Sequence, residues 1–585
     1  MNKVFSQPKY QNKQGYSGFP MDHLVNFTSV CGYLIPVYTD ILSPGDKVNI
    51  DTIMRSNTQP LSKPAMATCI ERVEWFAVPI DQLYKPFSTK FYGISDVSSD
   101  LLPESGYNDT LPYISEQNLH NFLKGLTPGF DPTIEEPNVP SFQEAKRLCD
   151  ALGYTKYLGE PADPDSYDFN GSVSAIIPAA YQKIYYDHFR LTEWEANNVK
   201  AYNLDSYNQN MHVTQTDRLN SLFKLHRRPY QKDYFTSMLP SPLVGSGSVS
   251  MAGVDLTKVS QWLTGLTNLM TGVPTSNSNP NTNSGTVSYN VSKPSSVGFK
   301  RAVPAESVSS VRTAVADISS SINPANIRSM FAVEKLLQVT RRSKKHYDMQ
   351  TLAHFGIDVP KGLSGECFKL GTFESFIKIG DVVSTAASGE DPLGTLAGRG
   401  SSNNSSTRRD PIKFEAKCHC VLMAIYSVEP IVNYVNEGTM RINRMTSASD
   451  FYKPEFDNLG EQPVFAYEIT DKEYDQADPG DYDPYYVSGW QKRYQQLKAK
   501  YNRSFAGVTT PFFSEWALNR ASSLHGIVGR NYFQVWPTDM NNILDYQYIG
   551  DETYSDMYSQ DYLINQIYFN VSKSSKMSVH GVPSL

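Results

Sequence analysis

The sequence of 585 residues predicts a mainly β fold, an eight-stranded jelly roll whose two packed sheets form a β-sandwich, with long and partly helical insertions between the strands. Segments rich in β-branched and aromatic residues lie near the two ends of the chain. They are residues 29–38, 47–54 and 66–78 at the start, and 411–428 and 562–572 toward the end. Strands so far apart in the sequence pair when the middle of the chain is looped out, as in a jelly roll with large insertions.

The length of the chain indicates how much of it lies outside the strands. An eight-stranded jelly roll needs roughly 150 to 200 residues, so most of this chain must be insertion. We expect one jelly-roll domain from 24 to 585, with the largest insertions within 85–410. Residues 1–23 predict a flexible N-terminal arm, which is either simply disordered or becomes ordered against the inner surface of an assembly or a neighbouring chain.

A helix is predicted from Pro324 to about Arg342. Asn323 is a suitable N-cap, proline is favoured at the first helical position, and apolar residues follow at helical spacing. Cationic side chains crowd the C-terminal end of this helix, where they complement its dipole. Such an end is either solvated or in contact with nucleic acid.

Two tracts hold too little apolar surface to fold alone, residues 272–297 and 399–407. Both predict exposed loops. The first tract belongs to a longer segment, 243–321, which also contains a short apolar stretch, Val259–Leu266. We expect an outward loop with a small packed base and a polar tip.

Six cysteines occur without a CxxC pair. Around Cys418-His419-Cys420, alternation along the predicted strand 411–428 places both cysteines on one face and His419 on the other. Because free cysteine behaves as a small buried hydrophobe, we expect core packing here rather than metal ligation. Free thiols fit a reducing compartment such as a cytoplasm.

The sequence contains none of the motifs GxxxxGK[ST], GxSxG, HExxH or GxGxxG, so no catalytic, cofactor-binding or metal-binding residue is predicted. The formal net charge of -7 is unlike that of a protein that condenses DNA by itself. No apolar run is long enough to span a membrane, and the N-terminus lacks the apolar core of a signal peptide.

Two segments carry a resemblance to a known family, Arg228–Pro242 and Asp450–Pro463. Both resemble stretches of the major capsid proteins of microviruses, small single-stranded DNA bacteriophages, and particularly of the gokushovirus-like branch. Further matches follow in the family's order, among them Gly32–Asp46, Glu74–Tyr84 and Ile177–Arg190. After Phe355-Gly356 the chain departs from the family pattern, and inferences from the family transfer least there.

The resemblance implies a viral jelly roll and a structural, non-enzymatic role. Sixty copies are expected to form a closed T=1 icosahedral shell around a circular single-stranded DNA genome, together with other phage structural proteins. Because the chain is acidic, a separate small basic protein is expected to neutralise most of the DNA. The protein is then expected in the virion, after assembly in the cytoplasm of the bacterial host and without membrane insertion.

Contacts with the genome are expected to be non-specific phosphate contacts. The candidates are cations of the arm and of the helix end: Lys3, Lys9, Lys13, Arg341, Arg342, Lys344 and Lys345.

In gokushovirus-like capsids a large insertion rises from the shell as a protrusion thought to meet the host cell, and 243–321 resembles that variable region. The candidate host-receptor contacts lie at its polar tip: Thr275, Ser276, Asn277, Ser278, Asn279, Asn281 and Asn283. A mobile loop without a partner is the alternative for this tip.

Two other classes of protein fit the same β-rich pattern. One is a secreted β-sandwich that binds carbohydrate or hydrolyses glycosides, since a glycoside hydrolase needs only two facing carboxylates. The other is a monomeric surface adhesin with the same fold. Closed assembly distinguishes a shell subunit from both.

Overall fold

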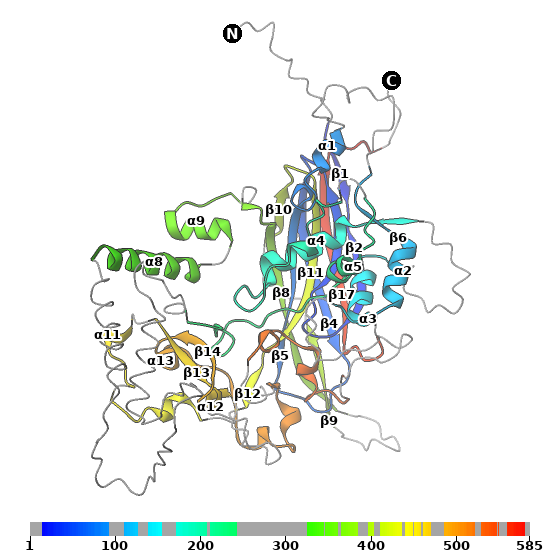
Figure 1. Ribbon diagram of the computed structural model, residues 1–585. Coiled ribbons are helices and arrows are strands. Elements are labelled where there is room, and N and C mark those ends of the chain that lie inside the picture. The colour runs from blue at the N-terminus through cyan, green and yellow to red at the C-terminus, as the bar shows by residue number, and fades with distance from the viewer. Residues whose placement is uncertain are drawn as a thin grey trace, which may run out of the picture. The chain divides into compact units, whose positions relative to one another are not determined.

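The computed structural model describes residues 15–92, 110–126, 139–154, 171–207, 211–242, 324–343, 346–360, 364–383, 396–402, 410–435, 439–448, 450–457, 460–469, 485–520, 528–546, 548 and 558–579 (Figure 1). The chain divides into two compact units. The first comprises Met1–Ser241, His346–Asp348 and Asp358–Leu585, and the second comprises Pro242–Lys345 and Met349–Ile357.

Ten strands of the described part form one antiparallel sheet in the first unit. Its order is β1-β17-β4-β9-β8-β5-β11-β3, with β2 also beside β17 and β10 also beside β4. The strands are β1 (Ser17–Pro20), β2 (His23–Ser29), β3 (Ile35–Leu42), β4 (Lys47–Thr58), β5 (Thr68–Pro79), β8 (Phe368–Val383), β9 (Leu396–Ser402), β10 (Ile412–Glu415), β11 (Cys420–Pro430) and β17 (Leu563–Ser575).

The sheet curls until its two ends touch through side chains. The ring of Tyr38 on β3 lies 5.4 Å from that of Phe569 on β17, and both rings pack on Trp75 of β5. Lys573 Nζ of β17 lies 3.1 Å from Asp40 Oδ2 of β3. This half-barrel confirms the mainly β fold predicted from the sequence and is consistent with a jelly-roll β-sandwich, here with ten strands in place of eight.

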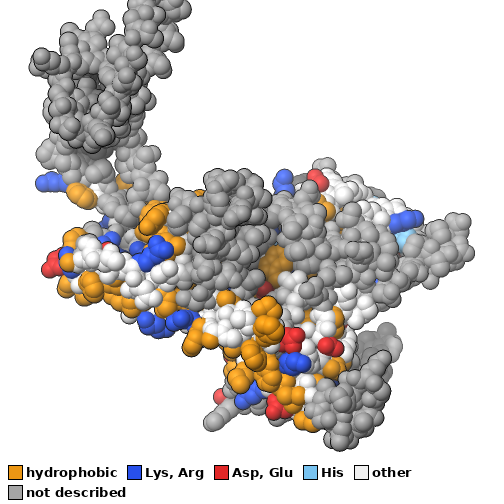
Figure 2. Space-filling view, turned by 90° about the horizontal axis from the view of Figure 1, so that it is seen from below, with side chains coloured by type: hydrophobic (Ala, Val, Ile, Leu, Met, Phe, Trp, Pro, Cys, Tyr) orange, Lys and Arg blue, Asp and Glu red, His pale blue; other side chains and the backbone are white. Residues whose placement is uncertain are grey.

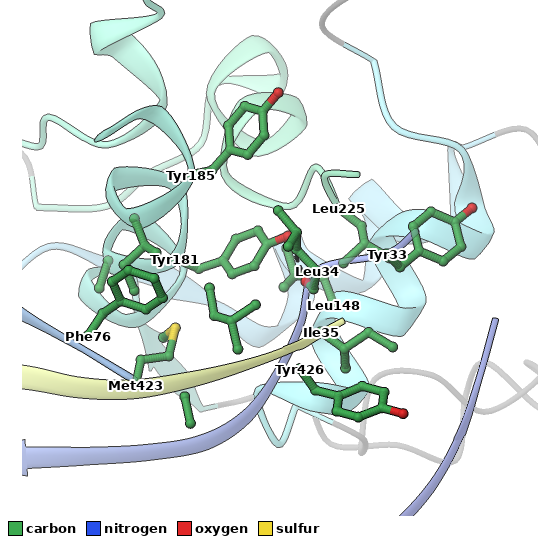
Figure 3. Packing of buried hydrophobic residues seen from close by; sticks show 14 of the residues in the cluster. Tyr33, Leu34, Ile35, Phe76, Leu148, Tyr181, Tyr185, Leu225, Met423 and Tyr426 are labelled. Carbon is green, nitrogen blue, oxygen red and sulfur yellow. Dashed lines mark hydrogen bonds between the residues drawn. The ribbon is translucent and has the colours of Figure 1, made fainter. Parts of the chain in front are cut away.

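The central strands are covered on both faces. β5 and β11 are buried along almost their whole length, whereas β17 alternates buried and exposed residues as expected for a strand with one solvated face. Helices α3 (Phe142–Ala151) and α4 (Ile176–Ile184) pack against β3, β5 and β11. Figure 3 shows Tyr181 of α4 pointing at Leu34, whose carbonyl oxygen accepts a 2.9 Å hydrogen bond from its hydroxyl.

Three boundaries differ from those predicted. The predicted strand 29–38 spans the end of β2, a buried turn and the start of β3, because its apolar residues continue through the turn. The predicted strand 411–428 is broken at residues 416–419, so that β10 pairs with β4 while β11 pairs with β3 and β5. Residues 17–20, predicted as part of the arm, form β1 against β17.

The insertions add short helices and three small sheets. The helices are α1 (Phe87–Tyr92), α2 (Glu116–Lys124), α5 (Thr216–Leu222), α11 (Pro454–Asp457), α12 (Ala466–Ile469) and α13 (Gln495–Lys498). The small sheets pair β6 (Tyr113–Ser115) with β7 (Ser172–Ser174), β13 (Glu461–Phe465) with β14 (Val487–Lys492), and β12 (Asn433–Val435) with β15 (Arg503–Ser504) and β16 (Asn519–Arg520). None of the helices that the structure describes is long and apolar enough to cross a membrane.

Helix α8 (Pro324–Arg342) has the bounds predicted from its N-cap and proline, which confirms that prediction. Helix α9 (Tyr347–Phe355) follows it. Gln350 Nε2 donates a 2.8 Å hydrogen bond to the carbonyl oxygen of Thr340, and His354 Nε2 lies 3.0 Å from the hydroxyl of the same threonine. These contacts hold the two helices together.

A buried polar cluster ties the interior of the sandwich together. The hydroxyl of Tyr426 on β11 donates a 2.9 Å hydrogen bond to Asn565 on β17, and the Asn565 amide donates one of 2.7 Å to Ser29 on β2. The Ser56 hydroxyl on β4 donates a 2.5 Å hydrogen bond to Glu71 on β5. Because such groups are costly to bury without partners, the cluster fixes how these strands face one another.

Candidate functional site

The residues predicted to touch the genome or the host fall largely outside the described structure. Arg341 and Arg342 are the last two residues of α8, but their side chains lie outside the described part, as do Lys344 and Lys345. Lys3, Lys9, Lys13 and the seven predicted host-contact residues from Thr275 to Asn283 lie outside it as well. The structure therefore brings none of these candidates together, and they stay predictions.

The segment Arg228–Pro242, in contrast, is described completely and attaches the insertions to the sheet. The guanidinium of Arg228 pairs with the carboxylate of Glu74 on β5, which also pairs with Lys369 on β8. Arg228 Nη1 donates a further 2.9 Å hydrogen bond to Ser427 on β11. We call these residues and the second ionic group described next the ionic junction.

The second ionic group lies beside the first. Arg72 of β5 donates to Glu374 of β8 at 2.7 Å and to Glu429 of β11 at 2.5 Å. The other oxygen of Glu429 accepts a 2.6 Å hydrogen bond from the backbone N–H of Gln231. Glu429 therefore links the sheet directly to the backbone of the inserted segment.

Burial and the neighbouring cations have opposite effects on the pKa of Glu74, whose side chain is only 2% exposed. Burial by itself would raise the pKa of Glu74, but Arg228 and Lys369 outweigh burial and lower it to about 2. The carboxylate is therefore ionised at neutral pH, and its charge is matched by two cations. Removing the carboxylate would leave Arg228 with only the more distant Glu429 as an acidic partner, 3.6 Å from its Nε atom.

The rest of the segment packs in two places, with Tyr230 in the main hydrophobic core and Tyr234, Phe235 and Met238 in a second apolar cluster. The Tyr230 hydroxyl donates a 2.6 Å hydrogen bond to Asp539, and the Tyr234 hydroxyl donates one of 2.9 Å to Glu468. Asp233 accepts a 2.6 Å hydrogen bond from Tyr434, while Phe235 packs in the cluster itself. One short segment thus connects the sheet to insertions that lie far away in the sequence.

The second segment behind the resemblance, Asp450–Pro463, carries exposed aromatic rings in its described part. Phe451 and Tyr452 are each more than half exposed, and Phe456 in α11 is 41% exposed. Tyr452 packs its edge on the ring of Tyr494, with the ring centroids 5.3 Å apart. Apolar side chains that remain exposed in this way are typical of surfaces that bind another protein.

A second exposed aromatic surface lies on residues 505–516, which we call the aromatic loop. Phe512 is 87% exposed, Phe505 68% and Phe513 54%. The loop is nevertheless held by internal hydrogen bonds, from the Thr509 hydroxyl to the carbonyl oxygen of Ala506 at 2.8 Å and from the Thr510 hydroxyl to that of Gly507 at 2.6 Å. Figure 2 shows hydrophobic side chains gathered in several places on the face viewed from below.

The backbone of the aromatic loop stores strain. Ala506 has a φ of +60°, a left-handed conformation that residues with a Cβ rarely adopt. The side-chain amide of Asn519 donates a 2.9 Å hydrogen bond to the carbonyl oxygen of Val508, which helps to hold this conformation. An ordered backbone that presents apolar rings to solvent is organised in advance for binding.

A groove with a volume of about 610 Å³ lies along β1, β4, β10 and β17. Lys47, Lys413 and Lys573 line it together with Phe19 and Phe414. Lys573 is partnered by Asp40 and Asp46, and Lys47 lies 3.9 Å from Glu415. Because Lys573 is only 7% exposed and is paired with two carboxylates, Lys47 and Lys413 are the cations that the groove presents beside its aromatic rings, as on surfaces that bind single-stranded nucleic acid.

Among the described residues, no group of three or more His, Cys, Asp or Glu side chains has a geometry that could hold a metal ion. His419, between the two neighbouring cysteines, packs on Phe87 and Phe91 with ring centroids 5.3 and 4.4 Å away.

Comparison with known proteins identifies the class. The sequence profile of the family described as "Capsid protein (F protein)" matches residues 117–585, which is most of the chain. The chain belongs to this family. It is a microvirus-like major capsid protein, as the resemblance of its segments predicted.

A relative in this class is the capsid protein VP1 of Chlamydia phage 1. It is 22% identical to this chain over 624 aligned positions, which cover 97% of this chain and 95% of that protein. Membership of the family implies self-assembly into a shell with other virion components, and a structural role.

Sequence reasoning missed the residues that the structure makes prominent. The ionic junction joins partners from β5, β8, β11 and the inserted segment, and no local pattern reveals such pairing. The local signal was the arginine of Arg228-Pro229-Tyr230, which lies in one of the two segments that resemble the family. The aromatic loop carried a signal in its clustered phenylalanines, but composition alone does not distinguish exposed rings from buried ones.

We expect Glu74→Gln to lower the free energy of unfolding by about 2 to 4 kcal/mol at pH 7, because it leaves Arg228 buried beside a neutral group. The folded pKa of Glu74, about 2, lies below its ordinary value of 4.5. The carboxylate therefore stabilises the fold fully above about pH 4.5, and this stabilisation is lost as the pH falls toward 2. The difference between wild type and variant should shrink over the same range, as measured by denaturant unfolding of the purified subunit.

Glu415→Gln is the matched control. Glu415 and its partner Lys47 are each 56% exposed at the side chain, so the control should change stability by less than about 0.5 kcal/mol. Equal effects of the two substitutions at pH 7 would show that the ionic junction does not stabilise the subunit.

Proposed function

We propose that sixty copies of this chain form a closed T=1 icosahedral shell that encloses a circular single-stranded DNA phage genome, assembled in the cytoplasm of the bacterial host. The observation that carries the proposal is the family match over most of the chain, joined to ordered backbone that presents aromatic rings to solvent. Closed symmetric assembly buries such surfaces without leaving free ends.

The aromatic loop is the part of the described surface best suited to a contact between subunits. Three phenylalanines on a hydrogen-bonded loop supply large apolar area, and little further ordering is needed when they bind. The exposed rings of Phe451, Tyr452 and Phe456 offer a second such surface. In a shell, each would be covered by a neighbouring copy.

The genome is proposed to be neutralised mainly by a separate small basic protein, because the chain has a formal net charge of -7. The subunit itself would add a few non-specific phosphate contacts. Candidates are the cations predicted from the sequence and, in the groove, Lys47 and Lys413. A map of the assembled particle in which the groove faces outward would remove it as a candidate.

Phe512→Ser tests the assembly surface. We expect the yield of closed particles to fall at least about tenfold, because loss of one buried aromatic anchor weakens an interface by roughly 2 kcal/mol per contact and each particle repeats that contact many times. The measurement is sedimentation of particles from expressing cells, checked by electron microscopy. Phe512→Leu, which keeps an apolar side chain, is the control and should assemble.

Far-ultraviolet circular dichroism of the Phe512→Ser subunit should match that of the wild type, since the side chain is 87% exposed. A normal particle yield from Phe512→Ser would place the aromatic loop away from subunit contacts.

The polar tip of segment 243–321 is proposed to contact the host cell, because a loop tip can vary without touching the core. Replacing residues 274–286 with a short Gly-Ser linker should leave particle yield unchanged and reduce adsorption to host cells, as measured by residual free particles. Unchanged adsorption would reject the receptor role, and failure to assemble would place the tip at a subunit contact.

A further inference from the structure

The corner between β10 and β11 holds two cysteines on either side of one histidine. The chain leaves β4 at the end of β10 and joins β3 and β5 at Cys420, the first residue of β11. Backbone hydrogen bonds fix this corner, from Ala416 N–H to the carbonyl oxygen of Asp46 at 2.8 Å and from Ile80 N–H to that of His419 at 3.0 Å. The two cysteines are therefore held at a defined separation.

Their sulfur atoms are already neighbours. Cys418 Sγ lies 3.5 Å from Cys420 Sγ, and Cys420 Sγ lies 3.3 Å from the carbonyl oxygen of Cys418. All six cysteines of the chain are free thiols, and five of them are buried. Cys418 is the one that solvent reaches, and a second thiol stands directly beside it.

The same pair has unequal acidities. A hydrogen bond with the neighbouring Cys420 favours the Cys418 thiolate and lowers the pKa of Cys418, against burial and the charge of Asp81. The hydrogen bond and burial raise the pKa of Cys420. Cys418 is thus suited to attack an oxidant, and Cys420 is suited to act second, which is the usual arrangement at reversible oxidation sites.

We propose that Cys418 and Cys420 form a reversible oxidation site that closes to an internal disulfide when the protein meets a small disulfide oxidant. The Cys418 thiolate attacks one sulfur of the oxidant, forms a mixed disulfide and releases one thiolate. The Cys420 sulfur then attacks Cys418 Sγ, releases the second thiolate and gives up its proton to solvent. Two protein thiols are oxidised to one disulfide, and the oxidant is reduced to two thiols.

The redox state of the two cysteines depends on the chemical environment of the protein. In a reducing cytoplasm both thiols persist, and outside the cell the disulfide closes. Closure also protects Cys418, because a disulfide is reversible whereas further oxidation of a lone thiolate to sulfinic acid is not. This inference rests on the corner geometry and does not depend on the number of copies in a shell.

The test uses the full-length purified protein and oxidised glutathione under native conditions. After the reaction, free thiols are alkylated, and digested peptides are analysed by mass spectrometry. We expect the peptide containing residues 418–420 to lose two hydrogens without retaining glutathione, and dithiothreitol to restore it. The other four cysteines should not react in the folded protein, and they should be alkylated only after unfolding: Cys31, Cys69, Cys149 and Cys367.

Single substitutions separate the two roles. Cys420→Ser should retain glutathione on Cys418, because no second thiol displaces it, and Cys418→Ser should suppress reaction at residue 420 by at least about tenfold. A wild-type protein that keeps glutathione on Cys418, or that leaves both thiols free while a buried cysteine reacts, would overturn the proposal. Unchanged circular dichroism of both variants shows that folding is not the cause.

Discussion

The pairing of Arg228 with the buried carboxylate of Glu74 is the contact on which the joining of insertions and sheet depends. Two charges removed from water are stable only when each is matched, and here Lys369 and the neighbouring group of Arg72, Glu374 and Glu429 complete the match. The partners come from three strands and one inserted segment. A register shift in any of them would separate the charges, so the junction also fixes the strands relative to one another.

From the ionic junction the chain continues into the insertions. Tyr230 hydrogen-bonds to Asp539 in the main core, and Asp233 and Tyr234 hydrogen-bond to Tyr434 and Glu468 at a second apolar cluster. Tyr434 lies on β12, which pairs with β15 and β16 on either side of the aromatic loop. A capsid subunit needs both properties, a core that does not change and surfaces that are ordered before they meet a neighbour.

The sequence was informative where structure is local. Asn323-Pro324 predicted the start of α8, and β-branched and aromatic runs located β4, β5 and β17. The predicted strand 411–428 was wrong at residues 416–419, because alternation continues through a corner that only tertiary pairing reveals. The ionic junction escaped prediction since its partners are up to 357 residues apart, as for Arg72 and Glu429. The predicted genome residues rested on charge and the predicted host residues on family resemblance and composition, and their side chains lie outside the described part.

The mass of the assembled protein tests most directly whether this chain closes into a shell of fixed copy number, as we propose. Sixty copies of a 65.6 kDa chain amount to about 3.9 MDa. Native mass spectrometry or light scattering of DNA-free particles should show that copies of this chain contribute this mass to the particle. A chain that remains at 65.6 kDa, or that stops at a small oligomer under conditions in which the fold is intact, would contradict the account.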